Sequence, residues 1–206
     1  MSDVYLGRLP ILDTKQNVVA YELLFRADHH NKAIVANNSA ASANVIIETY
    51  GQLGIDNVIG KRRGFIKVDA QLLMHDSILL LPKKHVVLEI LRGVEITESI
   101  TQRCAFLKQK GYQLALSYTA QSSTHYDHIL SLVNIVKINV NELTSAHLIA
   151  VMKQLRRFPI LLLAEKVETQ ETAKHCISLN FQMLQGFFFT QPEVMSGKNI
   201  DPSKLS

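Results

Sequence analysis

The chain has 206 residues, of which 47% are hydrophobic and 19% charged, and these values predict one globular domain with a sizeable core. Its net charge of +4 is mild and its basic residues are mostly scattered, so neither a basic helix nor an aromatic platform favours nucleic-acid binding. The longest apolar runs, such as 78–81 and 160–164, are too short to cross a bilayer and no secretory signal is visible, so we expect a cytoplasmic protein without a membrane segment.

Short β-rich runs alternate with helical stretches along the chain. Several runs are continuously apolar, which is typical of parallel strands covered on both faces. The last run carries three phenylalanines, 187–189, which we expect to be core strand with one residue at its lip; if exposed, they would instead form an interaction surface. The predicted strands are 4–6, 18–25, 64–68, 86–90, 113–117, 135–138, 160–164 and 183–188.

Helices are predicted between these strands. Thr144 and Thr169 are suitable N-caps for two of them, and Gly111 is a suitable stop for a helix over 97–110. Further helices are predicted over 125–133 and from residue 39 or 40 to 51. Cys104 and Cys176 fall among apolar neighbours in two of these helices, so we predict two reduced core cysteines, which suits the cytosol.

Regular strand–helix alternation predicts a parallel sheet with outer helices. About eight strands indicate an α/β fold of the modified TIM-like (β/α)8 barrel type. The link over 10–17 is turn-rich and too short for a helical crossover, so the first strand is expected to pair antiparallel with the second. We assign residues 1–196 to the barrel and 197–206 to a C-terminal tail or linker.

Polar residues recur near the carboxyl ends of the predicted strands, where barrel enzymes place their active sites. Glu89 and Lys137 stand inside apolar runs, and such charges are costly unless they are paired or bind an ion. We therefore expect these side chains to converge. The set comprises Glu22, Lys67, Asp69, Glu89, Ser117, Tyr118, Lys137, Asn139, Glu165, Glu168 and Gln185.

Five segments resemble, in the same order, the motifs of the EAL domain family, which are bacterial cyclic di-GMP phosphodiesterases. Residues 22–26, Glu-Leu-Leu-Phe-Arg, are similar to the signature Glu-Ala-Leu-x-Arg, and they follow Pro-Ile-Leu-Asp at 10–13. The other four are Leu-Glu-Ile at 88–90, Val-Lys-Ile at 136–138, Ala-Glu-Lys-Val-Glu at 164–168 and Gln-Gly-Phe-Phe-Phe at 185–189. The resemblance implies a modified barrel with an antiparallel first strand.

The resemblance also implies roles for individual residues. In the family, carboxylates and an asparagine hold two divalent cations that activate a water for attack on a phosphodiester. Glu22, Glu89 and Glu165 match ligand positions, Lys137 matches the lysine near the attacking water, and Gln185 matches a late glutamine. Arg26 matches the signature arginine. It could contact a ligand phosphate or form a structural salt bridge, and the sequence does not favour either role.

The sequence departs from the family at the positions that hold metal. Lys67 replaces the asparagine, Ser117 and Tyr118 replace a pair of aspartates, Asn139 replaces a further aspartate, and Leu9 replaces a glutamine. Hard cations require several anionic oxygens, and these changes remove them. We hypothesise that Lys67 blocks the site by neutralising Glu22 and Glu89, and we expect no bound metal or cofactor.

These departures favour a non-catalytic domain that acts as a regulatory or protein-interaction module in bacterial signalling. Residues 4–11 look most like the EAL domains that precede an HDOD domain, so the expected partner is a protein or an adjacent regulatory domain. One alternative is an inactive cyclic di-GMP receptor that uses Arg26 and Gln185. A second is a phosphodiesterase with rearranged ligands and Mg²⁺ or Mn²⁺. A homodimer is a weaker expectation, because the segment through which active members dimerise differs here.

Overall fold

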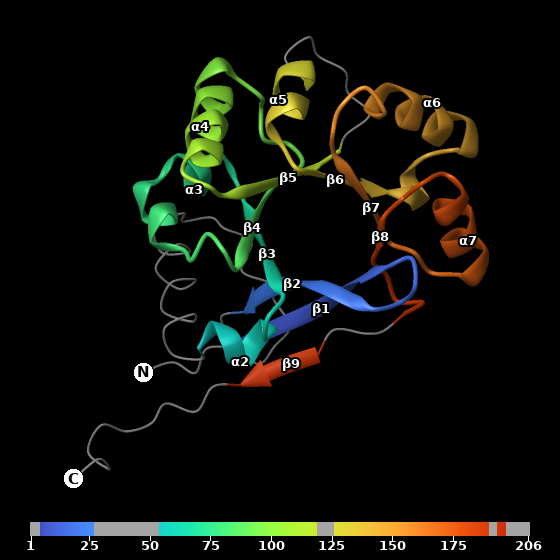
Figure 1. Cartoon of the computed structure of the whole chain (residues 1–206), viewed down its shortest axis with the longest axis horizontal. Helices are drawn as coiled ribbons and strands as arrows, with labels where there is room; N and C mark the ends of the chain where they lie inside the picture. Colours follow the sequence, from blue (N-terminus) through green and yellow to red (C-terminus); the bar gives the residue numbers. More distant parts are fainter. Residues whose placement is uncertain (1–4, 27–53, 119–125, 190–192, 197–206) are drawn as a thin grey trace.

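The computed structural model describes residues 5–26, 54–118, 126–189 and 193–196, and in these the strands form a ring with helices outside it (Figure 1). The strands are β1 (Tyr5–Asp13), β2 (Val18–Arg26), β3 (Arg63–Val68), β4 (Val86–Ile90), β5 (Gln113–Ser117), β6 (Ile135–Asn139), β7 (Leu161–Glu165), β8 (Met183–Leu184) and β9 (Glu193–Ser196). The α-helices are α2 (Ile55–Ile59), α3 (Ala70–Met74), α4 (Glu98–Gln109), α5 (Tyr126–Leu132), α6 (Ser145–Leu155) and α7 (Gln170–Ser178), and η1 (Asp76–Leu80) and η2 (Val140–Glu142) are 3-10 helices. The helix predicted over 39–51 lies outside the described residues.

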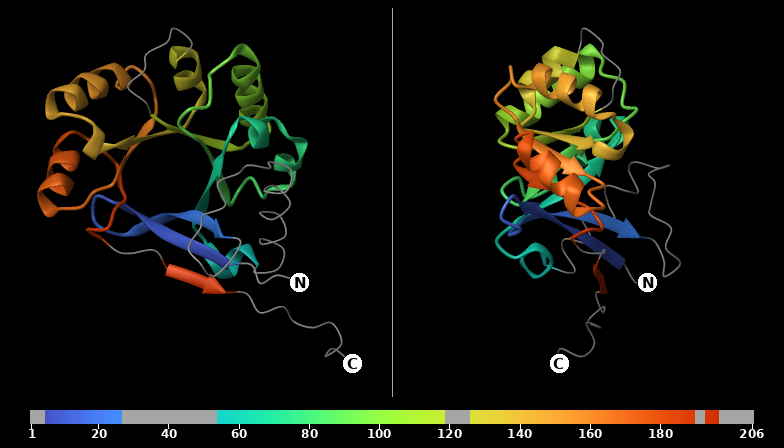
Figure 2. Two further views of the ribbon diagram at one scale, coloured as in Figure 1. Left: turned by 180° about the vertical axis from the view of Figure 1, so that it is seen from behind. Right: turned by 90° about the vertical axis from the view of Figure 1, so that its right-hand side faces the viewer.

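Eight strands close into a barrel, which confirms the predicted fold. Strands β2 to β8 pair parallel with their neighbours in chain order. Strand β1 closes the ring by pairing antiparallel with β2 on one side and with β8 on the other. Strand β9 then pairs with the first half of β1, outside the ring (Figure 2).

The first strand is longer than predicted. The expectation of a strand over 4–6 and a turn-rich link over 10–17 is wrong, because β1 continues to Asp13 and only residues 14–17 form the turn. Pro10 is tolerated because β9 pairs with 5–8 and β8 with 12–13, which leaves this position unpaired on that side. The Asp13 carboxylate accepts from the backbone N–H groups of Lys15 and Asn17 (both 2.8 Å) and so fixes the turn.

The core has two parts. A large cluster packs the outer faces of the strands against the helices, and it includes the buried, unpaired thiols of Cys104 and Cys176, as predicted. Burial raises the pKa of these thiols, to about 12 for Cys104 and about 11 for Cys176. A small cluster fills the barrel interior with one residue from each of the eight strands: Ile11, Ala20, Phe65, Val87, Ala115, Ile135, Leu163 and Met183.

The last barrel strand is shorter than predicted, and the expectation that 187–189 continue it is wrong. Strand β8 ends at Leu184, and the three phenylalanines form a turn in which the Phe187 side chain is 57% exposed. The turn packs tightly on the β7–α7 loop, where a Cβ on Gly186 would lie 2.0 Å from the Val167 carbonyl oxygen. Among the described residues, no helix has the length and apolar character needed to span a bilayer.

Candidate functional site

The candidate site is the next layer of the barrel interior above the small core cluster. Side chains of a strand alternate between its two faces, so the residue two positions further along points the same way. Two residues beyond the core cluster, toward the carboxyl ends of the parallel strands, β1 to β7 each contribute one residue, and Gln185 follows the last residue of β8. These are Leu9, Glu22, Lys67, Glu89, Ser117, Lys137, Glu165 and Gln185. The convergence expected from the sequence therefore follows from the barrel geometry.

Lys137 is the centre of this layer. Its side chain is fully buried, and its ammonium contacts three carboxylates: Oε2 of Glu22, Oε2 of Glu89 at 3.3 Å and Oε2 of Glu165 at 3.4 Å. Each carboxylate belongs to a different strand, so a single cation ties β2, β4 and β7 to β6. A buried charge survives in this way only when it is paired.

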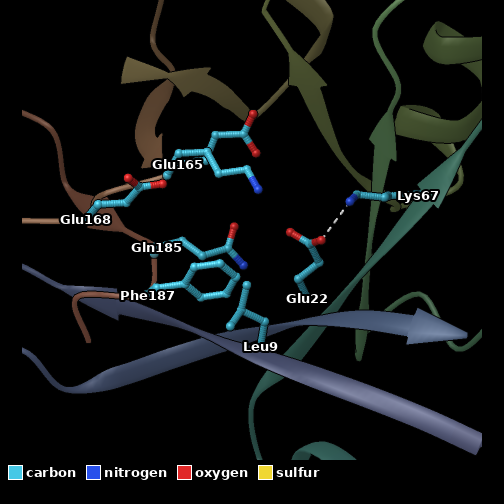
Figure 3. Close-up of a pocket in the computed structure, with 9 residues that line it drawn as sticks. Leu9, Glu22, Lys67, Glu165, Glu168, Gln185 and Phe187 are labelled. Carbon is cyan, nitrogen blue, oxygen red and sulfur yellow. Dashed lines mark ion pairs between the residues drawn. The ribbon is translucent and has the colours of Figure 1, made fainter. Parts of the chain in front are cut away.

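A second ammonium reaches the other oxygen of Glu22. Lys67 Nζ lies 2.7 Å from Glu22 Oε1, and the two side chains point toward one another across the open end of the layer (Figure 3). The Lys67 side chain is 41% exposed, so this pair faces solvent while the Lys137 pair does not. Lys67 thus pairs with Glu22, whereas the ammonium in direct contact with Glu89 is that of Lys137.

Ser117, the last residue of β5, and Tyr118, which follows it, bring no charge to the layer. Ser117 donates a hydrogen bond from its hydroxyl to Glu89 Oε1 at 2.8 Å and is buried. Tyr118 is half-buried beside it. The carboxylate of Glu89 is thereby held between a hydroxyl and an ammonium.

Three of the expected site residues lie elsewhere or are not described. Asp69 caps α3 by accepting from the Leu72 N–H at 2.7 Å, and Asn139 caps η2 by accepting from the Asn141 N–H at 3.1 Å. Both side chains serve the local backbone, which is the usual role of such residues at a helix start. The side chain of Arg26, at the end of β2, is outside the described part of the chain.

Arg92 is a site residue that the sequence analysis missed. Its guanidinium lies 3.2 Å from Glu165 Oε1 and also pairs with Oε2 of Glu142. It follows β4 by two residues, outside the apolar run that drew attention to Glu89. The signal that identifies it is its place in the loop at the carboxyl end of a barrel strand.

Burial and charge oppose one another in this cluster. Burial alone would raise the pKa of Glu22, but the ammonium groups of Lys137 and Lys67 outweigh it and hold the pKa to about 2. Burial raises the pKa of Glu89, against the attraction of Lys137. For Lys137, burial favours the neutral amine, but the charges of Glu89, Glu22 and Glu165 raise its pKa far above the ordinary value. Glu22 and Lys137 therefore stay ionised at neutral pH.

A small cavity opens above the layer. It has a volume of about 80 Å³ and is lined by Leu9, Glu22, Lys67, Glu165, Lys166, Glu168, Gln185, Gly186 and Phe187 (Figure 3). Gln185 is buried in its wall, and the amide nitrogen has no hydrogen-bond partner among the described residues. Pockets that bury a small organic ligand have volumes of several hundred Å³. The described part of this cavity suits a few water molecules.

The donor set does not fit a pair of divalent cations. Such ions need carboxylate oxygens that face a shared open position. Here the Lys67 ammonium pairs with Glu22, Ser117 and Tyr118 add no carboxylate at the end of β5, and no group of three or more His, Cys, Asp or Glu in the described ranges is arranged to hold a metal. A cation about 4 Å from an ammonium is repelled by roughly 4 kcal/mol per unit charge at an effective dielectric constant near 20.

Comparison with known proteins gives consistent matches. The EAL domain family model matches residues 9–192. The chain is 30% identical to the uncharacterized protein YuxH of Bacillus subtilis, over 96% of this chain and 49% of that protein. It is also 30% identical to the cyclic di-GMP phosphodiesterase CdgJ of Vibrio cholerae, over 100% of this chain and 48% of that protein. The chain thus spans about half the length of these two relatives.

A solved structure has the same fold. The Bacillus subtilis YkuI protein, which has an EAL domain and was crystallised with substrate c-di-GMP and calcium, matches with a TM-score of 0.72. The sequence identity is 22%, and the match covers 97% of this chain and 56% of YkuI. At this identity the likeness concerns the barrel fold.

Proposed function

Because the chain belongs to the EAL domain family, we propose that it is a non-catalytic member, which acts in bacterial signalling as a regulatory or protein-interaction module. The observation that carries the proposal is the Lys67–Glu22 ion pair, in which an ammonium lies 2.7 Å from Glu22 at the position that the resemblance assigns to a neutral asparagine. Because residues 4–11 resemble the EAL domains that precede an HDOD domain, we further propose that the chain belongs to that subgroup. The two buried thiols suit a reducing compartment such as the cytoplasm.

The charge balance supports the proposal. Three side-chain cations, Lys67, Lys137 and Arg92, contact the three carboxylates of the layer. Without the asparagine and the aspartate pair, the layer has no excess of anionic oxygens for two divalent ions. In this type of hydrolysis the metals lower the pKa of the attacking water, so a layer that does not hold them lacks the groups that supply this step.

A cyclic di-GMP receptor is the second candidate. The buried amide nitrogen of Gln185 supports it, since this donor faces the cavity without a partner among the described residues. The cavity volume of about 80 Å³ opposes it. A phosphodiesterase with rearranged ligands is the third candidate, and it is supported by the 30% identity with CdgJ.

Two measurements on the purified protein test the proposal. With Mg²⁺ or Mn²⁺ present, we expect no conversion of cyclic di-GMP to the linear dinucleotide and no heat of metal binding in calorimetry. Hydrolysis would establish the phosphodiesterase. Equilibrium binding of labelled cyclic di-GMP with micromolar affinity, without turnover, would establish the receptor instead.

A gain-of-binding variant makes the test sharper. Lys67→Asn combined with Ser117→Asp restores an amide and a carboxylate at two ligand positions, so we expect it to bind Mn²⁺ more tightly than the natural protein. Lys153→Asn, an exposed change on α6, is the matched control and should bind as weakly as the natural protein. Equal Mn²⁺ affinity in all three proteins would contradict the view that Lys67 and Ser117 disable the site.

A further inference from the structure

Two neighbouring leucines on η1 are exposed at the other end of the barrel. The run 78–81 is entirely apolar, yet Leu79 is 37% and Leu80 71% exposed while Ile78 and Leu81 are buried. A 3-10 helix repeats every three residues, so Ile78 and Leu81 share the inner face and the two residues between them point outward. The Tyr112 hydroxyl donates toward the carbonyl oxygens of Ile78 (3.1 Å) and Leu81 (2.9 Å), which fixes this orientation.

A groove runs beside these leucines. It has a volume of about 400 Å³ and is lined by Leu79, Leu81, Pro82, Lys83, Lys110 and Tyr112. Lys83 spans it with a hydrogen bond from its ammonium to the Lys110 carbonyl oxygen (2.9 Å). The exposed ring of Phe106 adjoins it, with Lys110 Nζ 5.3 Å from the ring centroid. Lys83 and Lys110 precede β4 and β5, so the groove lies at the strand ends opposite to the candidate site.

Lysines predominate around this groove, and the acidic residue of η1, Asp76, is paired with Arg103 at 3.1 Å. The stretches 78–85 and 104–112 contain four lysines, Lys83, Lys84, Lys108 and Lys110, and no acidic residue. All four side chains are exposed. Lys83 and Lys108 each donate a hydrogen bond to a backbone carbonyl group, which is their local role. These hydrogen bonds do not neutralise the positive charges, and the two stretches contain no carboxylate that would.

We propose that this groove docks an acidic, amphipathic protein segment. Its apolar side chains would lie against Leu79, Leu80 and Phe106, and its carboxylates would face Lys83 and Lys110. The lysines favour a negatively charged partner. The concave apolar floor favours a protein segment, because a nucleic acid does not bind through exposed leucines and a flat bilayer surface does not fill a groove. The inference rests on the proposed function, for which it names the docking surface and the chemistry of the partner.

Fluorescence anisotropy tests the inference with a synthetic amphipathic helix that carries leucine on one face and glutamate on the other. We expect saturable binding that weakens with salt, and no binding of the same helix with lysine in place of glutamate. Binding of both peptides, or of neither, would overturn the inference. Vesicles of phosphatidylserine and a DNA duplex are the further probes, and stronger binding to either one would assign the surface to that class instead.

Variants locate the binding. Leu80→Glu and Lys110→Glu each alter an exposed side chain of the groove edge, so we expect about a tenfold loss of peptide affinity for each. Ile149→Glu and Lys153→Glu are the matched controls on the exposed face of α6 and should leave the affinity unchanged. Circular dichroism confirms the fold of each variant. Equal affinity of groove and control variants would overturn the inference, whereas hydrolysis of cyclic di-GMP by the natural protein would overturn only the proposed function.

Discussion

The Lys137 ammonium and the Glu22 carboxylate form an ion pair inside the closed barrel, where their side chains are 0% and 6% exposed. Removing two charges from water is costly, and the pair survives because each partner has further contacts. Glu22 also pairs with Lys67, and Lys137 also contacts Glu89 and Glu165. The same network that stabilises these charges occupies the carboxylate oxygens that a metal would need.

Replacing Lys137 by methionine should strongly destabilise the protein. The change leaves Glu22 and Glu89 buried without their shared cation, and breaking a buried ion pair in this way costs about 3–5 kcal/mol. The free energy of unfolding in urea at neutral pH measures the loss. Adding Glu89→Gln to this variant should recover part of it, because Glu22 keeps its ion pair with Lys67 whereas Glu89 loses the ammonium that contacts it. Lys153→Met on exposed α6 is the control, and an equal effect of the two lysine changes would contradict the network.

Stability should fall as the pH is lowered from about 4.5 toward 2. The pKa of Glu22 is about 2 in the folded protein against 4.5 ordinarily, so the unfolded chain takes up the proton first and acid favours unfolding. The contribution of Glu22 is fully present above its ordinary pKa and lost as the pH falls through the folded one. At 1.36 kcal/mol per pKa unit it amounts to about 3 kcal/mol at most.

Glu22→Gln isolates this contribution. Glu89 acts with the opposite sign, since its raised pKa makes the folded protein take up a proton first and so favours folding in acid. The urea midpoint of the variant should therefore fall less steeply over this pH range than that of the natural protein. Parallel pH profiles of the two proteins would contradict the assignment.

The interior layer of the barrel was largely predictable from the sequence. Glu22, Glu89, Lys137 and Gln185 are polar residues in apolar strands, and the two-residue period of a strand places them on one face. The bounds predicted for β4 and β5 agree with the structure. Strand alternation and strand count together were enough to predict the closed barrel.

The parts that were missed depend on contacts between distant segments. Pro10 was predicted to lie in a turn, but it fits in a strand because β8 and β9 leave its outer side unpaired. Phe187 was predicted to lie in a strand, but it follows Gly186 into a turn that packs against the Val167 backbone. Arg92 reaches Glu165 across 73 residues of sequence, and local pattern carries no information about such a pair.

Replacing Lys166 by glycine should stabilise the protein. Lys166 has a φ of 63°, in the left-handed region that costs a residue with a side chain about 1 kcal/mol relative to glycine. Its ammonium lies 5.8 Å from the Phe187 ring centroid, a contact that the change removes at small cost because both side chains are exposed. We expect a gain of up to about 1 kcal/mol in the free energy of unfolding. Asn180→Gly, at a φ of 67°, should gain less, because asparagine tolerates this conformation better. A loss of stability in Lys166→Gly would contradict the strain.

Replacing Gly186 by alanine should be far more costly than the same change at Gly60. At Gly186 the added Cβ would lie 2.0 Å from the oxygen and 2.4 Å from the nitrogen of Val167, so the backbone must move and about 3 kcal/mol or more is lost. At Gly60 the φ of 60° strains an alanine, but no atom lies within 4 Å, so only about 1 kcal/mol is lost. The atoms that clash belong to the Val167 backbone, so adding Val167→Ala should bring no rescue. Urea unfolding of the three variants decides the matter: equal losses at Gly186 and Gly60, or rescue by Val167→Ala, would mean that the close approach does not shape this turn.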